Sequence, residues 1–569
     1  MKHFITALGV IALLLCPTNI DAKKKNEKKT EVPQMANYPS AVVSEYRLHE
    51  GDVVLKSHLI WPDSIKNAMN NASEEERKNT LKQAAQMINS RGVTAYIRNY
   101  ILNTEKIRVL TFNDECQIDT KINVPYPMYV YIAPFGNIYM CPGDTVDIAM
   151  DMTKRTKDEI FQFGGTGLGS EVNRITSEID RKYLNRANYS SFTFRNASQI
   201  DSLMMWRNEQ IARMDSMVIK MNEGLPELKD CSPLASDIVR THILTWYMEM
   251  IVSSYDNYPF VKGEYDRDAL WRNYFDFIAP RAKHLTDNPL LMIAADHFFF
   301  NRMEFKVFEP CTKLSHSIIH NEKGENILKS PDPKASTLVS SEEGVKIIES
   351  PDPEALTPFR QSLARGLQKM NDELHLSKND FSAQVTMLSE VFYQIHNGFF
   401  NNDSNLRAEA LAAIMPHITN PDLARLAVLD YRDFIKENEM EAMANKPMTK
   451  GDSIFQRIIE PYKGNVLSVD FWSMSCGPCR GGMLSERETV EQLKNESVKF
   501  LYVTDDAPEK CNPWLNENNI RGEHIFITRA EWALMQEKFT FSGIPFHVFV
   551  DKTGKVRTDV NDYRELMDK

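Results

Sequence analysis

A short segment near the C-terminal end, residues 466–480, constrains the fold more than any other part of the chain. The apolar run over residues 466–472 has the length and composition of a buried strand. Cys476 and Cys479 follow this run with a Gly-Pro pair between them, and a helical pattern of apolar residues comes next. The order of strand, Cys-x-x-Cys and helix predicts that the first cysteine lies at a helix N-terminus.

This position favours the thiolate form of Cys476 over the thiol. Unpaired backbone N–H groups and the positive end of the helix dipole lie at a helix N-terminus. Cys479 would follow one helical turn later, close enough to Cys476 to close a small disulfide ring. The arrangement is suited to reversible dithiol–disulfide exchange, in which a thiolate attacks a disulfide sulfur.

Three marks along the C-terminal segment resemble the thioredoxin superfamily. The first is the Cys-Gly-Pro-Cys core, which is the sequence of thioredoxin itself. The second is Ser-Gly-Ile-Pro at residues 542–545 before an apolar run, and the third is Asp-Lys-Thr-Gly-Lys at residues 551–555. The resemblance covers about residues 446–569. The 65 residues between Cys479 and Pro545 exceed what plain thioredoxin needs. Their length resembles the periplasmic TlpA/ResA-like branch, with an added helix and strand within residues 512–539.

The resemblance implies roles for several residues around the cysteines. Pro545 would be cis and face the disulfide, and Ile544 would offer its backbone to the substrate chain. Trp472, Gly477 and Pro478 are the further residues that we expect at the substrate-binding surface.

A dithiol mechanism follows from these roles. Cys476 would form a mixed disulfide with a substrate protein, and Cys479 would attack Cys476 to release the product. Asp470 matches the buried aspartate of thioredoxin. As an isolated buried acid it would have a raised pKa, suited to taking the proton of Cys479. The alternative for Asp470 is a half-exposed strand residue.

The resemblance also implies cofactors and partners. The Gly-Pro pair implies a reducing couple. No cofactor is expected beyond the Cys476–Cys479 disulfide, and no metal. The expected partners are protein thiols and disulfides, together with an electron donor that the sequence does not identify.

Three positions depart from the thioredoxin pattern. Ser475 stands where the family has a tryptophan, Leu484 where it has a helix proline, and Gly482 where it often has a glutamate. The serine removes an aromatic wall beside the first sulfur, and the missing proline removes a helix kink. These changes predict altered substrate choice with the thiol chemistry retained.

The N-terminal segment has the pattern of an export signal. Lys2 precedes a 12-residue apolar stretch, too short to span a bilayer, and a small residue follows at Ala22. We therefore expect a signal peptide over residues 1–22, a basic linker over residues 23–40, and a periplasmic or cell-envelope location. The alternative is a lipoprotein acylated at Cys16. No later segment is apolar enough to span a membrane, so the mature chain is expected to have no transmembrane segment.

The fold class predicted for the whole chain is multidomain α+β. Residues 41–165 read as a β-rich, sandwich-like N-terminal domain with one helix over residues 73–88. Residues 166–445 read as a helical domain, and residues 446–569 as a thioredoxin-like α/β domain. Helical apolar periodicity is found in the segments 200–218, 238–251, 269–282, 290–300, 363–374, 385–395 and 423–435.

An internal repeat interrupts the helical region. Residues 324–333 recur as residues 344–353, and both copies end in Ser-Pro-Asp-Pro. This ending is typical of turns or helix starts. We interpret residues 321–355 as a duplicated surface loop, with a partner-binding segment as the alternative.

Five cysteines lie outside the signal and the Cys-x-x-Cys pair. Cys116 and Cys141 both fall in the β-rich region and are the one pair we would name for a possible bridge, although small buried apolar residues are favoured for most of the five. The others are Cys231, Cys311 and Cys511. The alternative role considered for Cys511 is that of a third redox thiol.

The spacing of His316 and His320 fits a shared metal only if both lie on a helix, and two ordinary histidines are favoured. The formal charge of −11 argues against nucleic acid as a partner.

Two functions from different classes follow. The first is a secreted thiol:disulfide oxidoreductase that reduces protein disulfides. The second is a binding or scaffold protein whose helical region docks partners and whose Cys-x-x-Cys is a static bridge. A peroxidase is disfavoured because the chain lacks the peroxidatic Thr-x-x-Cys pattern.

Overall fold

The computed structural model describes most of the chain after residue 45. The described residues are 46–101, 104–154, 157–184, 200–256, 267–281, 287–293, four short strands between 317 and 347, 363–368, 377, 379–396, 404–443, 448–557, 560 and 562–567. The predicted signal peptide and linker lie outside them. None of the described helices is both long and apolar enough to cross a membrane.

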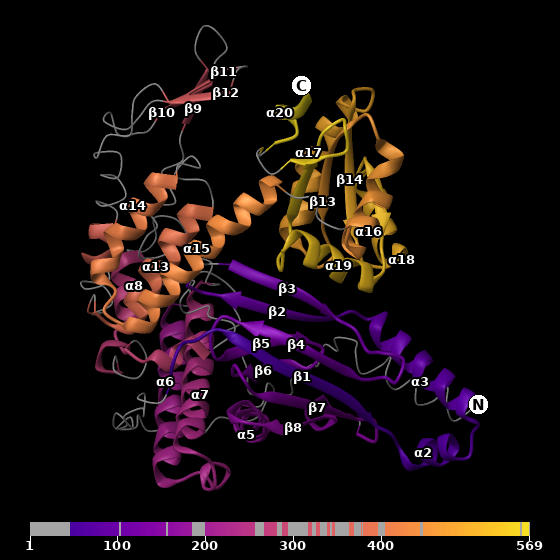
Figure 1. Cartoon of the computed structure of the whole chain (residues 1–569). Coiled ribbons are helices and arrows are strands. Elements are labelled where there is room, and N and C mark those ends of the chain that lie inside the picture. The colour runs from indigo at the N-terminus through magenta and orange to yellow at the C-terminus, as the bar shows by residue number, and fades with distance from the viewer. Residues whose placement is uncertain are drawn as a thin grey trace.

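The N-terminal part is built from two four-stranded sheets (Figure 1). Their inward-facing residues, such as Leu55, Val130 and Ile148, are fully buried in one core. The sandwich-like, β-rich fold predicted for this region is confirmed. One sheet has the order β4-β1-β7-β8, and the other has the order β3-β2-β5-β6. The strands are β1 (Gly51–Ile60), β2 (Val93–Asn99), β3 (Thr104–Leu110), β4 (Ile118–Val124), β5 (Met128–Ala133), β6 (Gly136–Met140), β7 (Thr145–Asp151) and β8 (Phe161–Thr166).

The helix predicted from a capping box in this region is α3 (Glu74–Asn89). Ser73 accepts a hydrogen bond from the backbone N–H of Glu76, and the Glu76 carboxylate accepts one from the N–H of Ser73. The local motif was enough to locate this helix. A shorter helix, α2 (Asp63–Asn70), precedes it and was not predicted, because it has no side-chain cap.

The central region is helical, as predicted. The long helices coincide with most of the periodic segments, but residues 290–293 lie in a short 3₁₀ turn, η5 (Pro289–Ile293), where a longer helix was expected. Buried residues of these helices belong to the same core as the two sheets. The helices are α5 (Leu168–Lys182), α6 (Ile200–Glu223), α7 (Pro233–Asp256), α8 (Arg267–Phe275), α13 (Phe381–His396), α14 (Ser404–Ile414) and α15 (Pro421–Met443).

The repeat differs from the predicted loop. Each copy contains a short strand, β10 (Asn326–Lys329) in the first and β12 (Gly344–Ile347) in the second. Together with β9 (Ser317–His320) and β11 (Leu338–Ser341) they form an antiparallel sheet of order β12-β11-β10-β9. The interpretation as a duplicated surface loop did not include these strands, in which the apolar residues before each Ser-Pro-Asp-Pro pair with neighbouring strands.

The possible bridge between Cys116 and Cys141 is not formed. Both cysteines are free, and burial raises the pKa of each thiol to about 12. Placement in one β-rich region did not bring the two sulfurs together. Cys231 and Cys511 are also free, and Cys311 lies outside the described residues.

The C-terminal part is a thioredoxin-like α/β domain. Its sheet has the order β15-β14-β13-β16-β17. Helices α16 and α19 supply core residues on one face of the sheet, and α17, α18 and α20 supply them on the other. The strands are β13 (Val466–Phe471), β14 (Val498–Thr504), β15 (Glu523–Phe526), β16 (Phe546–Val550) and β17 (Val556–Arg557). The helices are α16 (Lys450–Ile459), α17 (Gly477–Gln492), α18 (Pro508–Glu517), α19 (Arg529–Phe539) and α20 (Arg564–Met567).

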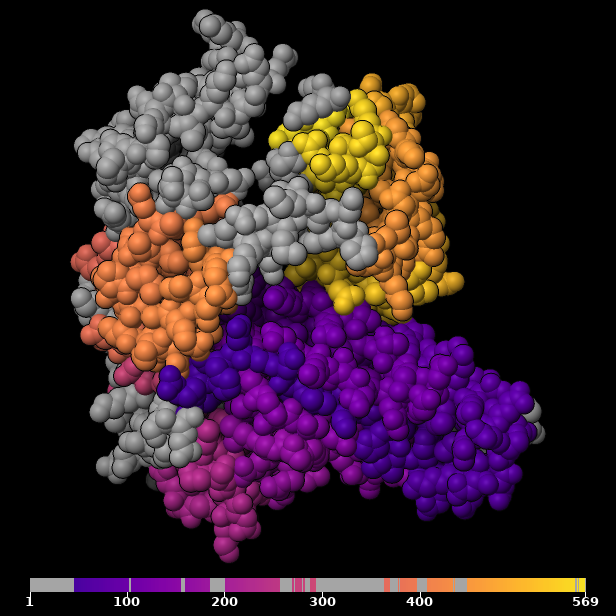
Figure 2. Space-filling model, viewed as in Figure 1, coloured from indigo at the N-terminus to yellow at the C-terminus, as the bar shows by residue number. Residues whose placement is uncertain are grey.

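The domain rests on the N-terminal sheets through α19 (Figure 1), and Figure 2 shows the two parts of the chain in contact. The Tyr96 hydroxyl on β2 donates a hydrogen bond of 3.0 Å to the side-chain oxygen of Gln536. The backbone N–H of Val109 on β3 donates one of 3.0 Å to the Glu537 carboxylate. Since β3 is an edge strand, Glu537 satisfies a backbone donor that the sheet leaves unpaired.

Candidate functional site

The two cysteines lie where a central strand passes into a helix. Strand β13 is hydrogen-bonded to β14 on one side and β16 on the other, and the chain after it turns into α17. Cys476 is the residue at the N-terminal cap of α17, and its Sγ accepts a hydrogen bond of 3.1 Å from the backbone N–H of Cys479. The predicted strand, Cys-x-x-Cys and helix are therefore present in that order.

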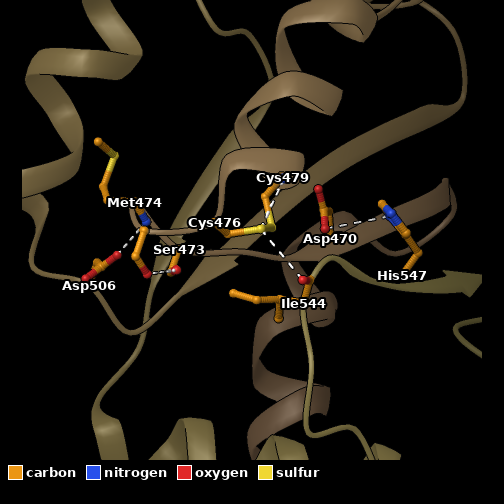
Figure 3. The surroundings of a disulfide bond; sticks show 9 residues. Asp470, Ser473, Met474, Cys476, Cys479, Asp506, Ile544 and His547 are labelled. Atoms are coloured by element: carbon orange, nitrogen blue, oxygen red, sulfur yellow. Dashed lines mark hydrogen bonds and ion pairs between the residues drawn. A yellow bond between two sulfur atoms is a disulfide. The ribbon is translucent and has the colours of Figure 1, made fainter. Parts of the chain in front are cut away.

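The cysteines form a disulfide with unequal access to solvent (Figure 3). The S–S bond closes a ring in which the two Cα atoms are 5.3 Å apart. Cys476 is 9% exposed and Cys479 is 1% exposed, while Gly477 and Pro478 between them are exposed. Of the two sulfurs, Cys476 is therefore the one that an incoming thiol could reach.

The loop before β16 faces the disulfide. The Ile544–Pro545 peptide bond is cis, and the carbonyl oxygen of Ile544 lies 3.7 Å from Cys476 Sγ. In the disulfide form the sulfur carries no proton, so this contact becomes a hydrogen bond only when Cys476 is a thiol. Ile544 is half-buried and Pro545 is exposed, which leaves this backbone accessible beside the more accessible sulfur.

Asp470 is buried on β13 beneath the disulfide. It is 8% exposed, which is not the half-exposed strand residue that we considered as the alternative. Burial, with the charge of Glu486 as a smaller cause, raises the pKa of Asp470 to about 8. Within the described part of the chain, Oδ1 has no hydrogen-bond partner. His547 Nδ1 lies 3.7 Å from Oδ1 of Asp470.

Two neighbours of Asp470 were missed by the sequence analysis. His547 on β16 and Tyr502 on β14 are the direct cross-strand partners of Asp470. Burial lowers the pKa of His547 and raises that of Tyr502. These cross-strand neighbours can be recognised only from the strand register, because 76 residues lie between Asp470 and His547 in the sequence.

Trp472 does not lie at a substrate-binding surface. It is 0% exposed and packs in the core, with its ring centroid 6.1 Å from that of Trp514. Expecting it at the surface was wrong, because helices cover both faces of the central strand that leads to it. Its indole ring supports the fold behind the disulfide.

The three positions that depart from the thioredoxin pattern are all exposed. Ser475 is exposed, and its hydroxyl lies 2.9 Å from that of Ser473. A Cβ at Gly482 would meet no atom within 4 Å, so this stretch of α17 is open. Leu484 is 38% exposed. The segment between β13 and α17 is held by Asp506, whose carboxylate accepts a hydrogen bond of 2.7 Å from the backbone N–H of Met474.

The alternative sites receive no support from the described residues. Cys511 is fully buried on α18, and burial raises the pKa of its thiol to about 11, so it lacks the features of a third redox thiol. His320 lies on strand β9, not on a helix. His316 lies outside the described residues. Within the residues that are described, no group of three or more His, Cys, Asp or Glu could hold a metal ion.

Comparisons with known proteins agree with a thioredoxin-like C-terminal domain. The AhpC/TSA family matches residues 449–566. A search of curated proteins finds no match for the chain.

Several solved structures are similar to this segment. The thioredoxin domain of a thiol-disulfide oxidoreductase from Bacteroides vulgatus is 22% identical over 17% of this chain and 71% of that chain, with a TM-score of 0.17. A thioredoxin-family thiol:disulfide interchange protein from Chlorobium tepidum is 15% identical over 19% and 77%, with a TM-score of 0.17. StoA from Bacillus subtilis is 17% identical over 17% and 75%, with a TM-score of 0.15. Similarities this low carry no argument about function.

Proposed function

We propose that this protein is an exported thiol:disulfide oxidoreductase that reduces disulfides in other proteins, in the manner of the periplasmic TlpA/ResA-like branch. The observation that carries the proposal is the contact between Cys476 Sγ and the carbonyl oxygen of Ile544. An accessible sulfur at a helix N-terminus lies beside exposed backbone that a substrate chain could pair with. Export rests on the signal pattern in residues 1–22, with acylation of Cys16 as the alternative.

The proposed reaction transfers two electrons from the dithiol to a substrate disulfide. The Cys476 thiolate attacks a substrate sulfur, the substrate disulfide breaks, and its other sulfur leaves as a thiolate that takes a proton from water. Cys479 then gives its proton to the Asp470 carboxylate and attacks Cys476 Sγ. The Cys476–Cys479 bond forms, and the second substrate sulfur leaves. An electron donor of the dithiol class would return the protein to its reduced form.

The charge and burial of Asp470 suit this step. With a pKa near 8, the carboxyl exchanges its proton close to neutral pH. It would take a proton as Cys479 becomes a nucleophile, and return it when the donor reduces the disulfide and Cys479 becomes the leaving group. A static structural bridge, as in the scaffold alternative, would need neither this acid nor an open Ile544–Pro545 loop.

The proposal predicts an order of thiol labelling. After mild reduction of the purified chain with dithiothreitol and a brief pulse of iodoacetamide, Cys476 should be alkylated first, because it is the more exposed sulfur and the one at the helix N-terminus. Peptide mapping by mass spectrometry measures the order. The buried free cysteines 116 and 511 serve as internal controls and should label only after unfolding. A bridge that resists mild reduction would support the scaffold function instead.

A further inference from the structure

A partly exposed histidine, His547, lies beside the buried Asp470 carboxyl. His547 is the cross-strand partner of Asp470, and in Figure 3 the Asp470 carboxyl lies between the disulfide and the His547 ring. The His547 side chain is 47% exposed, whereas that of Asp470 is 11% exposed. The histidine therefore touches both solvent and the buried carboxyl.

The other titratable groups that face Asp470 cannot serve as this link between the buried carboxyl and solvent. Tyr502 approaches from β14, but its hydroxyl is buried without a hydrogen-bond partner among the described residues, and its pKa is raised far above neutral. Glu486, from α17, acts on the carboxyl as a like charge and opposes its ionisation. His547 is the one of these three whose side chain both contacts the Asp470 carboxyl and reaches solvent.

We propose that His547 is a positioning residue that acts through Asp470, carrying the proton of the buried carboxyl to and from solvent. The inference rests on the function proposed above. Asp470 carries its proton for most of the time at neutral pH, because its pKa lies near 8. It must lose that proton before it can act as the base for Cys479.

The proposed transfer conserves every proton. The Asp470 O–H gives its proton to Nδ1 of neutral His547, and the imidazolium releases a proton from Nε2 to water. The resulting carboxylate takes the proton of the Cys479 thiol. The Cys479 thiolate attacks Cys476 Sγ and breaks its bond to the substrate sulfur, which leaves as a thiolate. The 3.7 Å between Nδ1 and Oδ1 needs to shorten only slightly for the first transfer.

The test separates the resolving step from the first attack. Reduced full-length protein is mixed with excess oxidised glutathione and quenched in acid, and mass spectrometry follows the glutathione adduct as it converts to the internal disulfide. In His547→Gln, whose side chain forms hydrogen bonds but does not titrate near neutral pH, the adduct should decay about tenfold more slowly at pH 7. The pH dependence of the decay should also shift relative to wild type.

Rescue and control variants distinguish proton transfer from a structural role. Added imidazole should restore the decay rate of His547→Ala, but not that of a double variant that also carries Asp470→Asn. His58→Gln is the matched control, since His58 Nδ1 lies 3.1 Å from Asp147 in the N-terminal sheet, far along the chain from the disulfide. It should behave as wild type.

Two negative results of this experiment would lead to different conclusions. If wild-type protein forms the internal disulfide and His547→Gln does so at the same rate with the same pH profile, the inference about His547 is wrong and the proposed function stands. If wild-type protein forms neither a glutathione adduct nor an internal disulfide, the proposed function itself is wrong. Circular dichroism of each variant confirms that a slower rate does not come from unfolding.

Discussion

Cys476→Ser is expected to abolish the reduction of insulin by this protein. A serine hydroxyl is not ionised at neutral pH and cannot form a mixed disulfide, so the loss should be about 10³-fold or more, down to the rate of dithiothreitol alone. The turbidity of precipitating insulin B chain, followed with dithiothreitol as the donor, measures the rate.

A second cysteine provides the matched control for this variant. Cys231 is a half-buried free cysteine of the central region, and its thiol donates a hydrogen bond of 3.0 Å to the backbone carbonyl of Leu228. Cys231→Ser should keep the wild-type rate. Full insulin reduction by Cys476→Ser would show that another thiol carries the activity.

Asp470→Asn is expected to stabilise the thioredoxin-like domain, and to do so increasingly as pH rises. Burial raises the pKa of this carboxyl from 3.8 to about 8 in the folded protein. Protonation therefore favours the folded state: its contribution is complete below the unfolded pKa and is lost as pH rises towards the folded pKa. The advantage of asparagine should grow between pH 4 and 8 and reach about 6 kcal/mol above pH 8.

Hydrogen exchange of the β13 and β14 amides in the oxidised protein measures this effect, since it reports the opening of one domain within a larger chain. Asp452→Asn supplies a control of opposite sign. Its pKa is lowered to about 2, with Lys538 and Thr449 opposing the effect of burial, so its removal should destabilise α16 at neutral pH. Equal exchange in wild type and Asp470→Asn at pH 9 would mean that the carboxyl is not held in a desolvated site.

Local motifs in the sequence were sufficient to predict the thiol site. The Cys-Gly-Pro-Cys core and the apolar run before it place both sulfurs at a strand–helix junction, and the Ile-Pro pair at 544–545 predicts the loop opposite. The burial of Asp470 could also be anticipated, because it lies within the apolar run. These features depend on residues adjacent in the chain, and the structure has the same arrangement.

Features that depend on distant pairings could not be predicted in this way. The position of Trp472 was predicted wrongly because a central strand covered on both faces buries nearly all of its side chains. The sequence pattern does not tell which end of the strand opens to a substrate. His547 was missed because its position beside Asp470 follows from the register of β16 against β13. The possible disulfide between Cys116 and Cys141 could not be judged from the sequence for the same reason. Two cysteines in one β-sandwich do not necessarily lie within bonding distance.

The contact between α19 and the N-terminal sheets could not be predicted from the sequence either. Gln536 and Glu537 read as ordinary polar residues of a helix, and only the fold brings them to Tyr96 and to the edge of β3. This contact connects the proposed redox domain to the rest of the chain through its α19 face, whereas the disulfide belongs to the core on the opposite face of the sheet.

Trapping of the mixed disulfide tests the central claim most directly. In Cys479→Ser the second thiol is gone, so a bond between Cys476 and a substrate sulfur cannot be resolved. Mixing this variant, reduced, with insulin should yield a covalent adduct that survives non-reducing electrophoresis and maps by mass spectrometry to Cys476. The absence of that adduct, or its attachment at another cysteine, would contradict the assignment of Cys476 as the attacking sulfur.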